Sequence, residues 1–299
     1  MHRTPEVKYA FMKDNRDEFD LNLMAEVLGV SRSGYYNWIK REPSKKEDWR
    51  SHIKAKIEGI FLSSKKTYGS PRVYRELLAH GYNIGENTVA RYMREIGLIA
   101  ITKKRYKVKT TDSKHDYPVA DNRLQQNFTA TKPNEIWLSD LTYIRTAEGW
   151  LYLVAILDLY SRKIIGWNLS TSLEAKGTIA ALDMAMKNRS PAPGLVFHSD
   201  RGVQYACGEF RGKLANFNII QSMSRKGNCY DNSPMESFFH TFKTEHIYPE
   251  NFERMTIQQA KTGVFQWIEC FYNRKRRHSS IGYQAPVAME GNNVLALAA

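Results

Sequence analysis

The segment GLVFHSDRGVQY, residues 194–205, indicates the fold most directly. Its apolar first half is typical of a buried strand, and Asp200 stands where that strand ends. In α/β folds the carboxyl ends of parallel strands face the crevice in which ligands bind, so Asp200 is placed where chemistry can occur. For Asp200 taken alone, the other reading is an ordinary turn with Gly202, and that reading stays open until other carboxylates are found nearby.

Strands and helices surround this segment in an order typical of one fold. Three stretches with strand composition, joined by connections short enough for antiparallel hairpins, occupy residues 136–146, 149–161 and 163–170. Helix and strand then alternate, at residues 172–190, 194–200, 208–218 and 219–224. This order predicts an α/β catalytic core with the mixed sheet of the ribonuclease H-like fold. Its first and fourth strands are neighbours at the centre of that sheet.

Two further carboxylates can join Asp200. Asp140 lies within the first predicted strand, where a buried charge is costly unless an arginine or a metal compensates it. Glu236 follows Ser233 and Pro234 in a pattern that also fits a helix capping box, which would explain the glutamate without any catalytic role. Three carboxylates in one crevice repel one another, and hard divalent cations such as Mg²⁺ relieve that repulsion. Two such ions support in-line attack on a phosphodiester.

The front of the chain reads as helical pairs followed by a basic arm. Residues 22–41 have the spacing of a helix-turn-helix, although an ordinary helical hairpin explains them as well. A second pair is predicted at residues 70–81 and 86–98. Cations that can contact DNA phosphates follow in this region, and a solvated helix face is the alternative for the first two of them: Arg91, Arg94, Lys103, Lys104 and Arg105.

Composition agrees with a polyanionic partner. The 299 residues carry a formal net charge of +13 with a pI of about 9.5, and most of the excess lies in residues 1–120. The three cysteines form no C-x-x-C pair, which argues against a zinc knuckle or a disulfide framework and fits a reducing cytoplasm. No apolar run is long enough for a membrane span and no secretory signal is evident, so we expect a soluble intracellular protein.

Five segments of the chain resemble the DDE transposases of the bacterial insertion sequence three family, specifically the product of the downstream reading frame. They are WLSDLTYI (137–144), LDLYSRKIIGW (157–167), HSDRGVQY (198–205), GNCYDNSPMESFFHTFKTE (227–245) and YNRKRRHSSIGYQAP (272–286). Two aspartates and a glutamate, with thirty-five residues between Asp200 and Glu236, are followed by a basic residue, Lys243, seven positions after the glutamate. This combination is specific to the family.

The resemblance implies a retroviral-integrase-like core in which Asp140, Asp200 and Glu236 hold two Mg²⁺ ions, for which Mn²⁺ can substitute. It implies that Lys243 contacts the transposon end. The partners it implies are double-stranded DNA, as terminal inverted repeats and as target, further copies of this chain, and the upstream reading-frame product, whose heptads this chain lacks. The place of action would be the nucleoid in the bacterial cytoplasm.

Other polar residues near these motifs have more than one interpretation. Asp158 does not match a catalytic position and is interpreted as structural. His198 and His240 could touch substrate, but a packed histidine is the more common case. The run RKRRH at residues 274–278 is either a solvated charge run or a contact to the DNA backbone, and we expect the second for Arg274, Arg276 and Arg277.

The sequence thus predicts five regions: a helix-turn-helix region (1–48), a second helical DNA-binding region with a basic arm (49–110), a linker (111–133), the catalytic core (134–248) and a helical, basic tail (249–299). The predicted function is a DNA transposase that binds insertion-sequence ends and catalyses Mg²⁺-dependent cleavage and strand transfer. A ribonuclease H-type nuclease and a regulatory DNA-binding protein with an inactive core are the alternatives.

Overall fold

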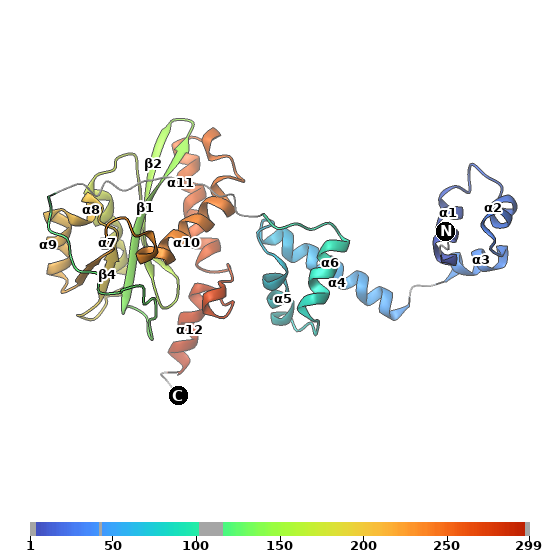
Figure 1. Ribbon diagram of the computed structural model, residues 1–299, viewed down its shortest axis with the longest axis horizontal. Helices are drawn as coiled ribbons and strands as arrows, with labels where there is room; N and C mark the ends of the chain where they lie inside the picture. Colours follow the sequence, from blue (N-terminus) through green and yellow to red (C-terminus); the bar gives the residue numbers. More distant parts are fainter. Residues whose placement is uncertain (1–3, 42–43, 102–115, 297–299) are drawn as a thin grey trace. The chain divides into compact units, whose positions relative to one another are not determined.

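The computed structural model describes residues 4–41, 44–101 and 116–296, and the chain divides into two compact units, residues 1–57 and 58–299 (Figure 1). Of the predicted DNA contacts, Lys103, Lys104 and Arg105 lie outside the described residues. None of the helices in the described ranges combines the length and the apolar character that crossing a membrane requires.

The first unit contains three short helices, two of which lie in the segment interpreted as a helix-turn-helix. Its helices are α1 (Pro5–Asp14), α2 (Leu21–Leu28) and α3 (Arg32–Lys40). The side chain of Asp20 caps α2, and Gly29 ends it in the left-handed region at φ 63°. Ser31 then caps α3 by accepting a hydrogen bond from the Gly34 amide. The small core of this unit comprises Met12, Met24, Ala25 and Tyr35.

The second unit begins with a helical hairpin. The long helix α4 (Lys45–Ser63) begins in the first unit and ends in the second, and α5 (Ser70–Ala79) and α6 (Glu86–Glu95) follow it. Apolar side chains from the facing sides of α5 and α6 are buried, namely Val73, Leu77, Val89, Tyr92 and Met93. The two helices therefore pack as a pair, as the sequence predicted.

The core is a five-stranded mixed sheet with the order β3-β2-β1-β4-β5. The strands are β1 (Ile136–Thr146), β2 (Gly149–Asp158), β3 (Ile164–Ser170), β4 (Val196–Ser199) and β5 (Ile220–Met223). The first three are antiparallel, while β4 pairs in parallel with β1 and with β5. This arrangement confirms the predicted ribonuclease H-like fold and the predicted neighbourhood of the first and fourth strands.

Helices cover both faces of the sheet, and alternation along the strands decides which side chains meet which helices. One face packs against α7 (Ala175–Arg189), α8 (Val203–Ala206) and α9 (Gly208–Asn216). A side chain on Gly166 of β3 would overlap the carbonyl oxygen of Ala181, so only glycine allows α7 to lie this close to the sheet.

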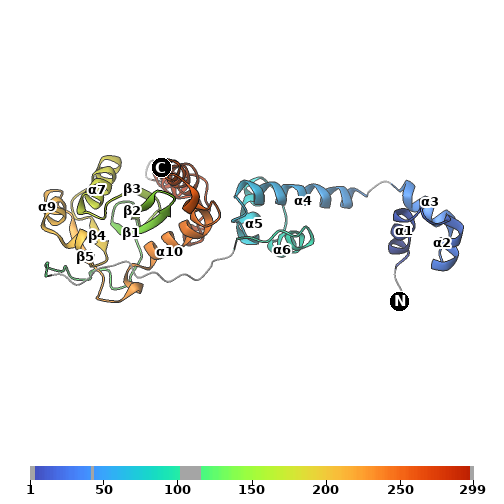
Figure 2. The same ribbon diagram turned by 90° about the horizontal axis from the view of Figure 1, so that it is seen from above.

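The other face packs against the C-terminal helices, and Figure 2 shows the strands between the two groups. The 3₁₀ turn η1 (Cys229–Asn232) leads directly into α10 (Ser233–Phe242), which continues as a wide π turn, η2 (Lys243–Ile247). The remaining elements are η3 (Phe252–Arg254), α11 (Ile257–Phe265), the π turn η4 (Gln266–Tyr272), η5 (Ser279–Ile281) and α12 (Pro286–Ala296).

Candidate active site

The register of the central strands brings Asp140 level with Asp200. In the parallel pairing of β1 with β4, Leu138 lies opposite His198. Asp140 follows Leu138 by two residues, and Asp200 follows His198 by two residues, so the two aspartates lie at equivalent positions. The pKa of Asp140 is raised well above its usual value, first by burial and next by the negative charge of Asp200. The two carboxylates therefore occupy one electrostatic site, as the sequence predicted from the sheet order.

Backbone amides hold both aspartates in place. Asp140 Oδ1 accepts a hydrogen bond of 2.8 Å from the Leu141 amide, and Asp200 Oδ1 accepts one of 2.9 Å from the Gly202 amide. A Cβ atom on Gly202 would lie only 3.0 Å from Asp200 Oδ1, so glycine leaves room for the carboxylate at the turn. The turn and the candidate site thus coincide at Asp200.

Helix α10 and the first residue of the π turn η2 bring Glu236 and Lys243 to the same site. The charge of Glu236 raises the pKa of Asp140 further, and the positive charge of Lys243 opposes that rise. Partial burial of the Glu236 carboxyl group raises its own pKa. The Lys243 ammonium lies 5.0 Å from the centre of the Tyr143 ring, and burial lowers its pKa although the charge of Asp140 acts the other way. Glu236 and Lys243 stand two turns apart, on one face of the helix.

The capping box considered for Glu236 does not form. Ser233 has helical dihedral angles, φ −55° and ψ −31°, because η1 runs into α10 without an extended residue between them. The residue before the helix is Asn232, and no side chain caps this end. A capping serine requires an extended backbone. The explanation that competed with a catalytic role for Glu236 is therefore wrong.

The donor chemistry at this site fits a hard divalent cation, since the acidic groups that act on one another are three carboxylates without a thiol. Within residues 4–41, 44–101 and 116–296, however, no three acidic, histidine or cysteine side chains are gathered closely enough to form a ready coordination shell.

A tyrosine behind the site joins the segment that carries Asp200 to β1. Tyr205 is fully buried, and its hydroxyl lies 2.9 Å from Ser139 Oγ. Ser139 Oγ lies 3.0 Å from the Ala155 carbonyl oxygen and donates its proton there, so Tyr205 donates to Ser139. Burial raises the pKa of Tyr205 well above its usual value, and the charges of Asp140 and Asp200 add to the rise.

Two other polar residues of interest, His198 and Asp158, are structural in this fold. His198 is buried, and its ring nitrogens lie 2.8 Å from Ser222 Oγ and 3.2 Å from Ser224 Oγ, away from any open surface. Asp158 is buried and accepts hydrogen bonds from the backbone amides of Asn134 and Tyr160, in agreement with the structural role expected for it. His240 lies half-buried on α10.

The basic residues expected to contact DNA fall into two groups. Arg91 and Arg94 are exposed on α6, and Arg274 is exposed near the C-terminus. Arg276 is instead buried and makes two hydrogen bonds to Glu245, while Arg277 makes two to Glu76 of α5. These guanidinium groups are occupied by carboxylates of the same chain, which argues against the DNA contact expected for Arg276 and Arg277.

A pair of residues that the sequence did not single out lies at the start of α10. Asp231 and Asn232 are both buried and polar. Their position directly before a helix that carries an acidic candidate residue was the available signal, although nothing in the local pattern distinguishes them from surface turn residues.

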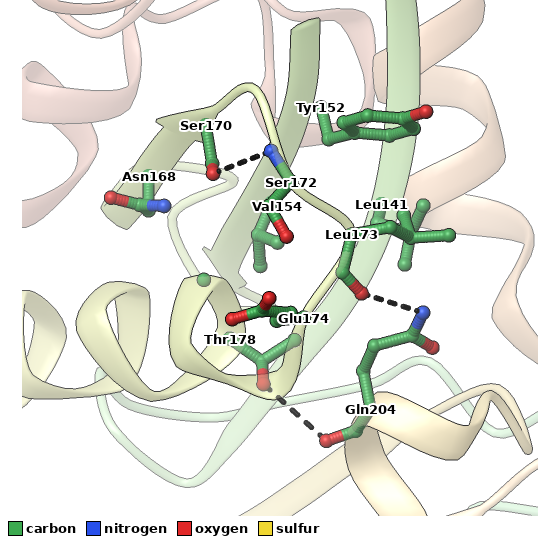
Figure 3. A pocket seen from close by; sticks show the side chains of 11 residues that line it. Leu141, Tyr152, Val154, Asn168, Ser170, Ser172, Leu173, Glu174, Thr178 and Gln204 are labelled. Atoms are coloured by element: carbon green, nitrogen blue, oxygen red, sulfur yellow. Dashed lines mark hydrogen bonds between the residues drawn. The ribbon is translucent and has the colours of Figure 1, made fainter.

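A shallow pocket lies on the face of the sheet opposite Asp140, since it includes Leu141, the next residue along β1. Gln204 Nε2 donates a hydrogen bond of 3.2 Å to the Leu173 carbonyl oxygen, and Thr178 Oγ1 donates one of 3.4 Å to the Gln204 carbonyl oxygen. Figure 3 marks both bonds with dashed lines. These bonds fix the loop after β3 to the segment after Asp200. None of the candidate catalytic groups lines this pocket.

Three family models match the chain. An HTH-like domain matches residues 48–106, and two integrase core domain models match residues 130–229 and 218–286. Transposase InsF for insertion sequence IS3A of Escherichia coli (strain K12) is 41% identical over 290 residues, which is 96% of this chain and 100% of the relative. An uncharacterized 31 kDa protein of insertion element IS600 from Shigella sonnei is 42% identical over 265 residues, 89% of this chain and 96% of the relative.

Solved structures of retroviral proteins are similar at lower identity. A simian T-cell lymphotropic virus intasome in complex with PP2A regulatory subunit B56 gamma aligns with a TM-score of 0.47 at 15% identity, over 72% of this chain and 69% of that chain. The HTLV-2 integrase catalytic core domain in complex with magnesium aligns with a TM-score of 0.42 at 15% identity, over 54% of this chain and 99% of that one.

Proposed function

Because this chain belongs to the family of insertion-sequence transposases that includes InsF of IS3, we propose that it binds the ends of an insertion sequence and cleaves and joins DNA strands at Asp140, Asp200 and Glu236. The observation that carries the proposal is the parallel pairing of β1 with β4, which sets Asp140 and Asp200 at equivalent positions on neighbouring strands although they are distant in the sequence. The charges of Asp200, Glu236 and Lys243 all act on the carboxyl group of Asp140.

Asp140, Asp200 and Glu236 would hold the divalent cations, two Mg²⁺ ions or Mn²⁺ in their place. When bound, such ions supply an activated water or 3′-hydroxyl and stabilise the leaving oxygen of the phosphodiester. The chain's own contribution is to hold the carboxylates in position. The amides of Leu141 and Gly202 do this for the two aspartates, and the first turn of α10 does it for Glu236. Lys243 presents a cation beside them for a phosphate of the transposon end.

Double-stranded DNA is the partner in this proposal, both as terminal inverted repeats and as target. Arg91, Arg94 and Arg274 are the exposed cations assigned to its backbone, with α3 as the helix of the first unit that faces DNA. Several copies of this chain would assemble on the two ends, and the upstream reading-frame product is a further candidate partner. Acting on these ends places the protein at the nucleoid in the bacterial cytoplasm.

The test is a calorimetric titration of the full chain with Mn²⁺, combined with a cleavage assay on duplex DNA that carries the element's own ends. The Asp140→Asn, Asp200→Asn double variant should lose Mn²⁺ binding and cleavage but retain end binding. Asp183→Asn on the exposed side of α7 is the matched control and should keep all three. Unaltered Mn²⁺ binding in the double variant would place the metal site elsewhere, and cleavage that ignores the end sequence would favour a nuclease.

A further inference from the structure

Two polar side chains at the junction of η1 and α10 are almost completely buried. Asp231 has an exposed fraction of 0% and Asn232 of 4%. Burying a charged or amide group without compensation is costly, so the partners of these residues reveal what they hold together.

Asp231 connects three segments of the chain. Its carboxylate accepts hydrogen bonds of 2.9 Å from Asn122 Nδ2 and 3.0 Å from Gln126 Nε2, both in the segment before β1. It also accepts from the backbone amide, Nε and Nη2 of Arg225, at 2.8, 2.9 and 2.8 Å. The side-chain hydrogen bonds from Arg225 are the main reason why the pKa of Asp231 lies far below its usual value. A permanently charged carboxylate thus fixes the chain just before α10.

Asn232 connects the same turn to the central strand. Its Nδ2 donates a hydrogen bond of 3.1 Å to the carbonyl oxygen of Ser139, the residue that precedes Asp140. Its Oδ1 is buried and has no hydrogen-bond partner within the described residues, and the side chain does not cap α10. The side-chain amide of Asn232 therefore bonds to β1 and does not cap α10.

The geometry of α10 transmits this contact to Glu236. Glu236 stands one helical turn after Asn232, and a hydrogen-bonded turn moves as a rigid element. A displacement of the Asn232 turn from β1 would carry the Glu236 carboxylate away from Asp140 by a similar amount. Second-row contacts of this kind orient metal-binding carboxylates in proteins.

We propose that Asn232 and Asp231 are positioning residues of the active site, which set the distance between the carboxylates of Asp140 and Glu236 by fixing the first turn of α10 to β1. The inference rests on the proposed function, because it concerns the same carboxylates. It adds two residues that touch neither DNA nor metal and act through Glu236.

Asn232→Ala is the direct test, and Asn273→Ala is its matched control. Asn273 is 2% exposed, and its Nδ2 donates a hydrogen bond of 2.9 Å to the carbonyl oxygen of Ile164 on β3. Its Oδ1 also accepts one of 2.9 Å from the Ile164 amide, so this residue is likewise a buried asparagine that bonds to a strand, but it bonds to β3 and not to β1. Mn²⁺ affinity by calorimetry, KM and kcat for cleavage of end DNA, and Tm would be measured on the full chain.

Asn232→Ala should lower Mn²⁺ affinity and kcat on the order of 10- to 100-fold with KM for DNA unchanged, as loss of an outer contact to a metal ligand does. Asn273→Ala should lower Tm and leave Mn²⁺ affinity and kcat near their wild-type values. Should Asn232→Ala fail to fold, Asn232→Leu retains the side-chain shape without the N–H group and is compared with Asn273→Leu.

Wild-type Mn²⁺ affinity and kcat in a folded Asn232 variant would overturn this inference alone. Equal losses of Mn²⁺ affinity in the Asn232 and Asn273 variants would also overturn it, because the effect would then be general destabilisation. Failure of the wild-type chain to bind Mn²⁺ or to cleave DNA would overturn the proposed function and this inference with it.

Discussion

Arg276 and Glu245 form a buried, two-pronged ion pair, with distances of 2.7 Å from Nε to Oε2 and 2.7 Å from Nη2 to Oε1. Arg276 is only 3% exposed although it stands within a run of basic residues. Arg72 of α5 reaches the same carboxylate at 3.5 Å, and Arg277 pairs with Glu76 of the same helix. The basic run therefore fastens the helical hairpin to the π turn that begins at Lys243.

Removal of Arg276 should destabilise the protein strongly. Arg276→Ala leaves the Glu245 carboxylate buried with only the longer contact to Arg72, and breaking a buried pair in this way costs about 3 kcal/mol of unfolding free energy. Urea denaturation followed by fluorescence measures the change. Arg274→Ala, two residues away on the surface, should leave the unfolding free energy almost unchanged, and similar losses in both variants would contradict the buried pair.

Neutralising Glu236 should separate catalysis from stability. Glu236→Gln removes a charge that opposes ionisation of Asp140, so Tm in metal-free buffer should stay the same or rise slightly. Cleavage and strand transfer should be lost, since a neutral amide is a poor ligand for a hard cation. Glu209→Gln, at an exposed glutamate in the first turn of α9, is the control and should transfer strands normally. Normal transfer by Glu236→Gln would exclude a three-carboxylate mechanism.

Replacing Thr256 should destabilise the protein more than replacing Ser233, because only the Thr256 side chain caps a helix. Thr256 forms a true capping box with Gln259, in which Thr256 Oγ1 accepts from the Gln259 amide at 3.2 Å and Gln259 Oε1 accepts from the Thr256 amide at 2.9 Å. Thr256→Ala should therefore cost about 1 kcal/mol of unfolding free energy. Ser233→Ala should cost clearly less, because its side chain caps nothing. A larger loss for Ser233 in thermal denaturation would restore the capping box.

The buried His198 should make stability depend on pH. Burial lowers its pKa from 6.5 to about 4 in the folded chain, so between these values the unfolded chain binds more protons than the folded one. The part of the unfolding free energy that depends on a neutral His198 is fully present above pH 6.5. It is lost as the pH falls towards 4, and the total loss is about 3 kcal/mol.

Replacing the histidine tests this dependence. His198→Gln should flatten the rise in unfolding free energy between pH 4 and pH 6.5, measured by denaturant titration at each pH. His80→Gln, at an exposed position, should leave the rise intact. An unchanged slope in His198→Gln would mean that another group titrates in this range.

The exposed arginines of α6 should control the salt dependence of DNA binding. If Arg91 and Arg94 each neutralise one phosphate, the double alanine variant should reduce the slope of log affinity against log salt concentration by roughly 2, because each contact contributes about 0.9. Lys176→Ala, an exposed cation on α7, is the control and should not change the slope. Fluorescence anisotropy with end DNA between 50 mM and 200 mM salt, roughly the range over which such slopes are resolved, is the measurement.

The sequence by itself determined the order of helices and strands and the sites of the carboxylates. Strand alternation, short hairpin connections and the apolar run before Asp200 are local patterns, and the sheet order that follows from them placed Asp140 beside Asp200. The motifs around these residues carried the family resemblance, which the 41% identity to a known transposase confirms.

Only the tertiary structure decided which polar side chains face solvent and which are buried and paired with other residues of the same chain. Arg276 and Arg274 belong to the same basic run, yet one is buried because Glu245, on another element, meets it in space. Ser233 fits a capping pattern but is helical because the preceding turn continues into α10, and Asn232 reaches a strand that lies far back in the sequence. Charge and capping patterns are local, whereas burial and pairing depend on contacts between residues that are distant along the chain.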